Sequence, residues 1–300
     1  LRLIRILYER YKLSKTQIAR IFNVSTKTIS RRLQGLGVKS RPANGRQIRP
    51  PMISISDKEK AYMTGLVHDL TPIWDSPNQL RIQLTTTHPE LEKLIMRTFE
   101  YIQSKKEAYF QSKLKCKGYA YKITLVVDKA YGFLYKSNCR KFYRFLEAII
   151  KKYPYHVLAG LWDADGHISI QCSKRRKRKT IEYYYRVEIG LRKGGRKITK
   201  LIYNILKELG YNPRRYKLKD KKKRITWVVR LNRKNEIIRF LELLPIRHKE
   251  KIAVKMVIIR SNLSIEEQYK WYRRFRALIK KRVSEYKKRA KQEYLKKQAR

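Results

Sequence analysis

The sequence predicts an α+β protein whose central part is a duplication. Between residues 56 and 263 the order helix, two strands, helix, two strands, helix occurs twice, as judged from apolar alternation in the strands and helical spacing elsewhere. Each sheet must bury one face under helices and leaves its other face free. The expected segments are an all-helical unit at 1–38, a linker at 39–55, two halves at 56–150 and 151–263, and a basic helix at 264–300.

Charge is the most unusual feature of the composition. The chain of 300 residues carries a formal net charge of +51, which predicts a polyanionic partner. Nucleic acid is the leading candidate because each neutralised phosphate releases counterions. No apolar run approaches the roughly 20 residues of a membrane-spanning helix, and no signal-peptide pattern opens the chain, so no membrane partner is expected. Three widely spaced cysteines favour a reducing, cytoplasmic setting over a disulfide framework.

Residues 1–38 predict three short helices. Ser14 and Gln17 match a capping box at the start of the second helix, and a third helix is expected from Thr26 to Leu36, ended by Gly37. The phrase LSKTQIARIFNVSTKTISRRLQGLGV resembles a helix-turn-helix module of the resolvase and transposase type. In such modules the third helix enters the major groove of DNA. The residues of the third helix that we expect to contact DNA are Thr26, Lys27, Thr28, Ser30, Arg31 and Arg32. The alternative is a plain three-helix bundle with a basic surface.

The linker at 39–55 has no apolar periodicity and contains prolines and a glycine that interrupt regular structure. After it, Ser56 and Glu59 match another capping box and predict a helix from Lys58 to about Asp69. In the first half we then expect strands at 80–86, 108–115 and 119–127 and helices at 89–103, 131–134 and 142–150. In the second half we expect strands at 168–172, 183–191, 215–218 and 225–231 and helices at 197–209 and 236–243.

The C-terminal segment predicts one long helix. It opens with a third capping box, Ser264 and Glu267. Lysine and arginine surround every turn, so this helix would be poorly stable alone. We expect it to rest partly on the core and partly on nucleic acid.

An apolar helical run in the second half ends abruptly in an acid followed by glycine. Gly160 and Ala164 lie one turn apart and would let a partner helix approach closely. Gly166 suits a helix end and leaves Asp165 where the helix stops. The pattern alone is also that of an amphipathic helix with a solvated turn. Its wording from residue 158 to 166, L-A-G-L-W-D-A-D-G, however, resembles the signature of the LAGLIDADG homing endonucleases in eight of nine positions.

This resemblance covers approximately residues 56–262 and implies both a fold and a site. In the family, two pseudo-symmetric αββαββα units form an antiparallel sheet saddle that lies in the DNA major groove. The acid at the eighth signature position supplies a metal ligand from each of two packed helices. For this chain the resemblance implies Asp165 as a catalytic residue and as a ligand of Mg²⁺.

The first half carries a degraded copy of the signature. Its segment at 63–67 aligns with the start of the second signature and places Gly65 at the helix interface. The eighth position is Leu70, and the nearest acid, Asp69, comes one residue early. Successive helix residues are about 100° apart, so Asp69 would join Asp165 as a catalytic metal ligand only if the last turn tightens. His68 is the alternative ligand, although imidazole suits Mg²⁺ poorly.

The resemblance further implies a catalytic lysine at the end of the fourth strand of each half. Such a cation can stabilise the transition state or tune the attacking water. The positions that match are Lys129 in the first half and Lys234 in the second, with Asn235 one residue away from the latter. In a chain with 75 lysine and arginine residues, a lysine at a given place is weak support.

Two basic runs lie where the second half is expected to form hairpin turns. Such runs repel themselves and would not fold alone, and solvated loops are the alternative interpretation. Together with the net charge and the resemblance, they predict contacts with phosphates or bases. The residues concerned are Lys174, Arg175, Arg176, Lys177, Arg178, Lys221, Lys222 and Lys223.

Three functions are compatible with these features. The first is a homing endonuclease that cleaves a long double-stranded DNA site with Mg²⁺, acting as a monomer because both half-motifs lie in one chain. The second is a DNA-binding regulator with an idle core, or a nickase, which the altered first motif favours. The third is binding of structured RNA, as a maturase or ribosomal-RNA-associated protein, which the charge density and basic tail favour.

Overall fold

The computed structural model of the chain divides into two compact units, Leu1–Arg49 and Pro50–Arg300, so the boundary falls inside the predicted linker. No helix among the described residues has both the length and the apolar character needed to cross a bilayer. The described residues are 2–9, 13–38, 54–76, 78–111, 118–135, 139–175, 180–191, 195–219 and 225–299.

The first unit contains the three expected helices, α1 (Arg2–Glu9), α2 (Lys15–Ile21) and α3 (Thr26–Gly35). Both hydrogen bonds of the predicted capping box are present at Ser14, which starts α2. Asn23, with φ of 47°, makes the tight turn before α3. The helices enclose a small core of Ile4, Tyr8, Ile18, Ala19, Ile29, Leu33 and Val38. Most of the predicted linker, 39–53, lies outside the described residues.

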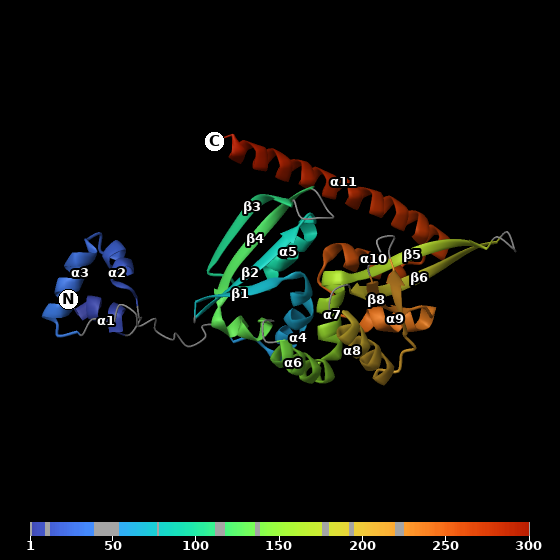
Figure 1. The fold of residues 1–300 in the computed structure, drawn as a ribbon, viewed down its shortest axis with the longest axis horizontal. Helices are drawn as coiled ribbons and strands as arrows, with labels where there is room; N and C mark the ends of the chain where they lie inside the picture. The colour runs from blue at the N-terminus through green and yellow to red at the C-terminus, as the bar shows by residue number, and fades with distance from the viewer. Residues whose placement is uncertain are drawn as a thin grey trace. The chain divides into compact units, whose positions relative to one another are not determined.

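The second unit contains two four-stranded antiparallel sheets with the same strand order. The first sheet has the order β1-β2-β4-β3 and the second has the order β5-β6-β8-β7. The predicted α+β fold with two similar halves is therefore confirmed (Figure 1). The strands are β1 (Thr71–Ser76), β2 (Gln79–Thr86), β3 (Gln103–Gln111), β4 (Gly118–Asp128), β5 (Gly166–Arg175), β6 (Thr180–Leu191), β7 (Arg214–Lys219) and β8 (Ile225–Leu231).

Helices connect and cover these sheets. At the centre, α4, the first helix of the first half, packs against α7, the first helix of the second half (Figure 1). One continuous apolar core joins the two halves. The helices are α4 (Asp57–Leu66), α5 (Pro89–Thr98), α6 (Cys139–Lys152), α7 (Pro154–Asp165), α8 (Gly195–Glu208), α9 (Lys234–Leu243), α10 (Lys249–Arg260) and α11 (Ile265–Gln298), with the short 3₁₀ helices η1 (Val67–Asp69) and η2 (Lys129–Leu134).

The paired strands show why one face of each sheet is covered. Leu80 lies opposite Val127 and Ile82 lies opposite Leu125, and all four are buried. Their neighbours on β2, such as Arg81, point to the other face and are partly exposed. Strict alternation of this kind is what a sheet with one packed and one free face requires.

Three elements differ from the sequence-based expectation. Strand β1 was not predicted, because Pro72 and Asp75 are poor strand formers; it is tolerated as an edge strand that pairs only with β2. Strand β3 begins at Gln103 instead of residue 108, since its polar first half is the exposed part of another edge strand. Helix α10 was also not predicted, and it proves important for the site.

Helix α11 confirms the predicted C-terminal helix, including its capping box at Ser264. It contacts β3, β4 and α5 of the first half as well as β5 and β6 of the second. Gln268 accepts a hydrogen bond from the Tyr185 hydroxyl at 3.0 Å near its start. Further along, the ring of Tyr286 lies 4.6 Å from that of Tyr121. The helix therefore runs along both halves on aromatic anchors, with its basic residues on the exposed side (Figure 1).

Candidate functional site

The site is built on the close approach of α4 and α7. A methyl group added at Gly160 would lie 2.0 Å from the backbone oxygen of Tyr62, and one added at Gly65 would lie 2.1 Å from the backbone oxygen of Val157. Real Cβ atoms essentially never come closer than 3.0 Å, so only glycine fits at either position. The structure thus places both predicted interface glycines at the crossing. Ala164 is half-buried and lines an adjacent cavity.

The last turn of the first helix is tightened. After α4, residues Val67–Asp69 continue as the 3₁₀ helix η1, which contacts α7. Leu70, the formal eighth position, is buried at 3% exposure and cannot present a ligand. The tightening is the one that would be needed to re-aim Asp69.

The two acids differ in their place before the strands. Asp69 is the last residue of η1, two residues before β1 begins at Thr71, whereas Asp165 directly precedes β5 at Gly166. The charges of both nevertheless act on one lysine, Lys251.

Asp165 is the final residue of α7, and its side chain is 35% exposed. Nδ1 of His68 lies 3.9 Å from Oδ2 of Asp165, so the end of the first half reaches the acid of the second. At this distance the imidazole lies beside the carboxylate. Because the carboxylate is partly exposed, a ligand can reach it from solvent.

A lysine that the sequence did not single out joins these acids. Lys251, in the first turn of α10, donates to the backbone oxygens of Trp162 and Asp163, the latter at 2.9 Å. Burial lowers its pKa to about 8, while the charges of Asp163, Asp69 and Asp165 act in the opposite direction. Lys251 thus places a cation among three acids at the end of α7. No local pattern distinguishes it among the many lysines of the chain.

Asp163, the other acid of the signature, holds the site together. It is 1% exposed, and its Oδ2 accepts hydrogen bonds from the Tyr62 hydroxyl at 2.7 Å and from the backbone N–H of Arg247 at 2.6 Å. The guanidinium of Arg247 lies over the Tyr62 ring and binds Glu59 with both of its terminal nitrogens. Burial raises the pKa of Asp163. This network connects α4, α7 and the segment before α10.

The two predicted catalytic lysines lie elsewhere. Lys129 follows Asp128, which pairs with Gln79 near the tip of the β1–β2 hairpin, whereas Thr71 at the helix end pairs with Gln83. Four residues of strand correspond to roughly 13 Å. Lys234 is the exposed first residue of α9, beyond the outward-running end of β8. The fourth strand of each half leads away from the acids, which is why neither lysine meets them.

The predicted nucleic-acid contacts are placed in part. On α3, Thr26, Lys27, Arg31 and Arg32 are exposed. Thr28 and Ser30 are partly buried, and their hydroxyls lie 2.8 Å from Ser25 Oγ and 3.0 Å from Lys15 Nζ, respectively. Lys174 and Arg175 lie at the end of β5. The remaining predicted residues, Arg176, Lys177, Arg178, Lys221, Lys222 and Lys223, lie outside the described residues.

Comparison with known proteins gives one family match. Residues 158–259 match the profile of the LAGLIDADG endonuclease family, from the signature through nearly all of α10. Among curated proteins, none matches this chain.

Several solved structures are similar to the chain at low identity. The structure of I-DmoI in complex with DNA and Ca is 15% identical to this chain, with a TM-score of 0.38. The matched region covers 63% of this chain and 89% of the I-DmoI chain. I-DmoI in complex with DNA and Mn is 16% identical, with coverages of 64% and 98% and a TM-score of 0.40. I-SmaMI bound to an uncleaved DNA target with calcium ions is 9% identical, with coverages of 75% and 98% and a TM-score of 0.40.

The family match agrees with the independent features of the second half. The matched segment contains the signature helix, its terminal acid and the lysine that the structure brings to it. The first half lies outside the match but repeats its strand order. Over residues 158–259, the chain is therefore similar to the LAGLIDADG endonuclease family.

Proposed function

We propose that this protein is a site-specific DNA endonuclease of the homing type. It would bind a long double-stranded site as a monomer and hydrolyse phosphodiester bonds with a divalent metal ion such as Mg²⁺. The observation that carries the proposal is the arrangement of Asp69 and Asp165 at the ends of two glycine-packed helices, with Lys251 in electrostatic contact with both.

The residues fit a hard divalent cation. Asp69 and Asp165 offer carboxylate oxygens, the donors that Mg²⁺ prefers, and both are accessible enough to share an ion with a phosphate oxygen. Asp163 is not a candidate ligand, because it is only 1% exposed and Tyr62 and Arg247 bind its Oδ2. A divalent ion bound there would lower the pKa of a water and neutralise charge on phosphorus.

The protein groups around the acids have separate tasks. Lys251 is largely protonated near neutral pH and can stabilise negative charge that builds up on the phosphate. Its hydrogen bonds to the last carbonyls of α7 also hold that helix end in place. His68 lies beside the carboxylate of Asp165. The exposed basic residues of α3 would supply phosphate contacts along the DNA, as would the basic run predicted between β5 and β6.

The test is cleavage of a supercoiled plasmid library that carries long random inserts, followed by sequencing of the linear products. Linear DNA should form with Mg²⁺ and not with EDTA. Asp165→Asn should lower the rate at least about 100-fold without weakening DNA binding, because it removes a group needed only for the reaction. Asp57→Asn is the matched control, since Asp57 is an exposed acid at the opposite end of α4.

Other outcomes would favour the alternative functions. Open circles as the final product would indicate a nickase, with Asp69 as the inactive partner. Binding without any cleavage, unchanged in Asp165→Asn, would refute the endonuclease and favour a regulator or an RNA-binding protein, for which the charge of +51 is the supporting observation. Salt titrations of duplex DNA and of structured RNA would separate those two.

A further inference from the structure

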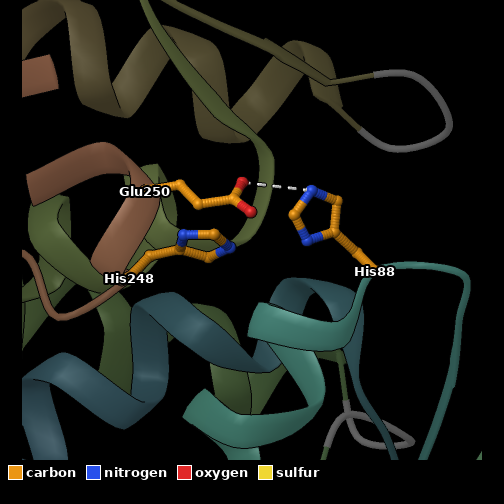
Figure 2. Close-up of side chains that lie close together, drawn as sticks. All are labelled: His88, His248 and Glu250. Atoms are coloured by element: carbon orange, nitrogen blue, oxygen red, sulfur yellow. Dashed lines mark ion pairs between the residues drawn. The ribbon is translucent and has the colours of Figure 1, made fainter. Parts of the chain in front are cut away.

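A second group of ligand-type side chains lies apart from the paired acids. His88, His248 and Glu250 each offer a donor atom, and these atoms all lie within 4.8 Å of one another. Figure 2 shows the three side chains converging from two helices: His88 precedes α5 of the first half, while His248 and Glu250 belong to the start of α10 in the second. The cluster therefore joins the two halves of the core.

Both histidines occupy unusual positions. Each is the N-cap residue of its helix, a place where serine, threonine, aspartate or asparagine normally accepts a hydrogen bond from the first turn. Neither His88 nor His248 makes a side-chain capping bond. Their rings instead meet edge to face, with centroids 5.5 Å apart at an angle of 61°. Both helices thus lack a side-chain cap, and the side chains of their N-cap residues contact each other instead.

Buried polar atoms remain without partners in this cluster. His248 is 5% exposed and Glu250 is 8% exposed. Among the described residues, Nδ1 of His88, Nδ1 of His248 and Oε1 of Glu250 have no hydrogen-bond partner. Native proteins rarely leave buried polar atoms unpaired, and coordination of an ion is one way in which such atoms are satisfied. His88 and Glu250 thus each keep an unsatisfied atom beside the close pair Nε2–Oε2, so the described residues do not complete the polar contacts of the cluster.

The spacing suits a tetrahedral ion. Nε2 of His88 lies 3.3 Å from Oε2 of Glu250. Two ligands at about 2.0–2.1 Å from a tetrahedral zinc ion are separated by about 3.3 Å, so this pair already has the required distance. The donor atom of His248 lies within 4.8 Å of both, so His248 completes the set once its ring moves closer.

We propose that His88, His248 and Glu250 bind a zinc-class transition metal ion that links α5 to α10. Two imidazoles and one carboxylate are the donors that such an ion prefers, whereas Mg²⁺ and Ca²⁺ prefer oxygen alone. The site is therefore distinct in chemistry from the paired acids. Because Lys251 follows Glu250 directly, the ion also fixes the turn that places this lysine.

Both cations and carboxylates surround the cluster. Lys251 and Arg276 line the same cavity and oppose cation binding. The charge of Arg97 acts on His248 and that of Arg282 on Glu250 in the same direction. Two buried carboxylates act against them, because Glu90 lies near enough to Glu250 to interact with its charge. Oε2 of Glu90 is a further buried atom without a hydrogen-bond partner among the described residues.

The experiment is a titration of the EDTA-treated full-length chain with ZnCl₂ by calorimetry, repeated with CoCl₂ to record the visible spectrum. We expect about one tight ion per chain and an intense tetrahedral cobalt spectrum, neither displaced by millimolar Mg²⁺. The double variant His88→Gln, His248→Gln should lose at least about 100-fold in zinc affinity, as should Glu250→Gln alone. Circular dichroism should show that both variants remain folded.

Two controls locate the ion. His156→Gln removes a histidine on α7 that is not part of the cluster and should leave binding unchanged. Asp69→Asn with Asp165→Asn should also retain zinc, which separates this site from the proposed catalytic one, whatever the outcome of the cleavage assay. The proposal is overturned if the wild type binds no tight zinc, or if the double variant and Glu250→Gln bind zinc as the wild type does.

Discussion

The packing of α4 against α7 allows the sharpest prediction, for Gly160→Ala. The new methyl group would lie 2.0 Å from the backbone oxygen of Tyr62 and 2.7 Å from the backbone nitrogen of Leu66. Because both contacts are backbone atoms of a helix, no side-chain rotation relieves them. The helices must separate by about 1 Å, which opens the close-packed interface along its length.

The expected cost follows from this geometry. Overpacking by one methyl group typically costs 1–3 kcal/mol, and a clash with backbone belongs at the upper end, about 3 kcal/mol. For a chain of this size, that corresponds to a fall in melting temperature of roughly 6–12 °C. Urea unfolding followed by circular dichroism should give the same difference in free energy of unfolding.

Gly118→Ala is the matched control, because a methyl group there meets no atom within 4 Å. It should change stability by less than about 0.5 kcal/mol. If Gly160→Ala proved as stable as Gly118→Ala, the inference that these glycines set the helix separation would be refuted. Cleavage should fall together with stability, since Asp165 moves with α7.

Three further predictions concern the surroundings of the site. Burial lowers the pKa of Lys251 to about 8, so the folded chain binds fewer protons than the unfolded chain between about pH 8 and 10.5. The stability of the wild type relative to Lys251→Met should therefore rise across that window by about 3 kcal/mol, and a flat difference in urea unfolding would contradict the burial. Asp163→Ala should cost about 3 kcal/mol in the same assay, because it leaves two donors unpaired, while Asp57→Ala, at an exposed site, should leave the unfolding curve nearly unchanged. Tyr286→Ala should speed amide hydrogen exchange in the C-terminal half of α11 by removing its stacking on Tyr121, and Tyr294→Phe, which keeps its ring, should not.

Much of the architecture was accessible from local pattern. The Ser14 and Ser264 caps, the alternation in β2 and the apolar run of α7 each depend on neighbours in sequence, so the corresponding elements were predicted close to their observed bounds. The edge strand β1 was missed because it is held by pairing with β2 and not by its own residues.

The site divides in the same way. Gly65, Gly160 and Asp165 could be selected by their place in a helical pattern and in a signature. Whether Asp69 can serve depends on the pitch of one turn, and the 3₁₀ helix η1 is the tighter turn that the prediction requires.

Sequence by itself determined the duplicated α+β fold, the glycine-packed helix pair and the acid of the second half, because each is written in residues that are close along the chain. Tertiary structure alone decided which cation joins the acids. Lys251 lies far from Asp69 in sequence and reaches it only because α10 returns to the helix ends, while Lys129 and Lys234 are carried away by their strands. Such contacts depend on how strands and helices pack across the molecule, which no local pattern in a chain this rich in lysine can encode.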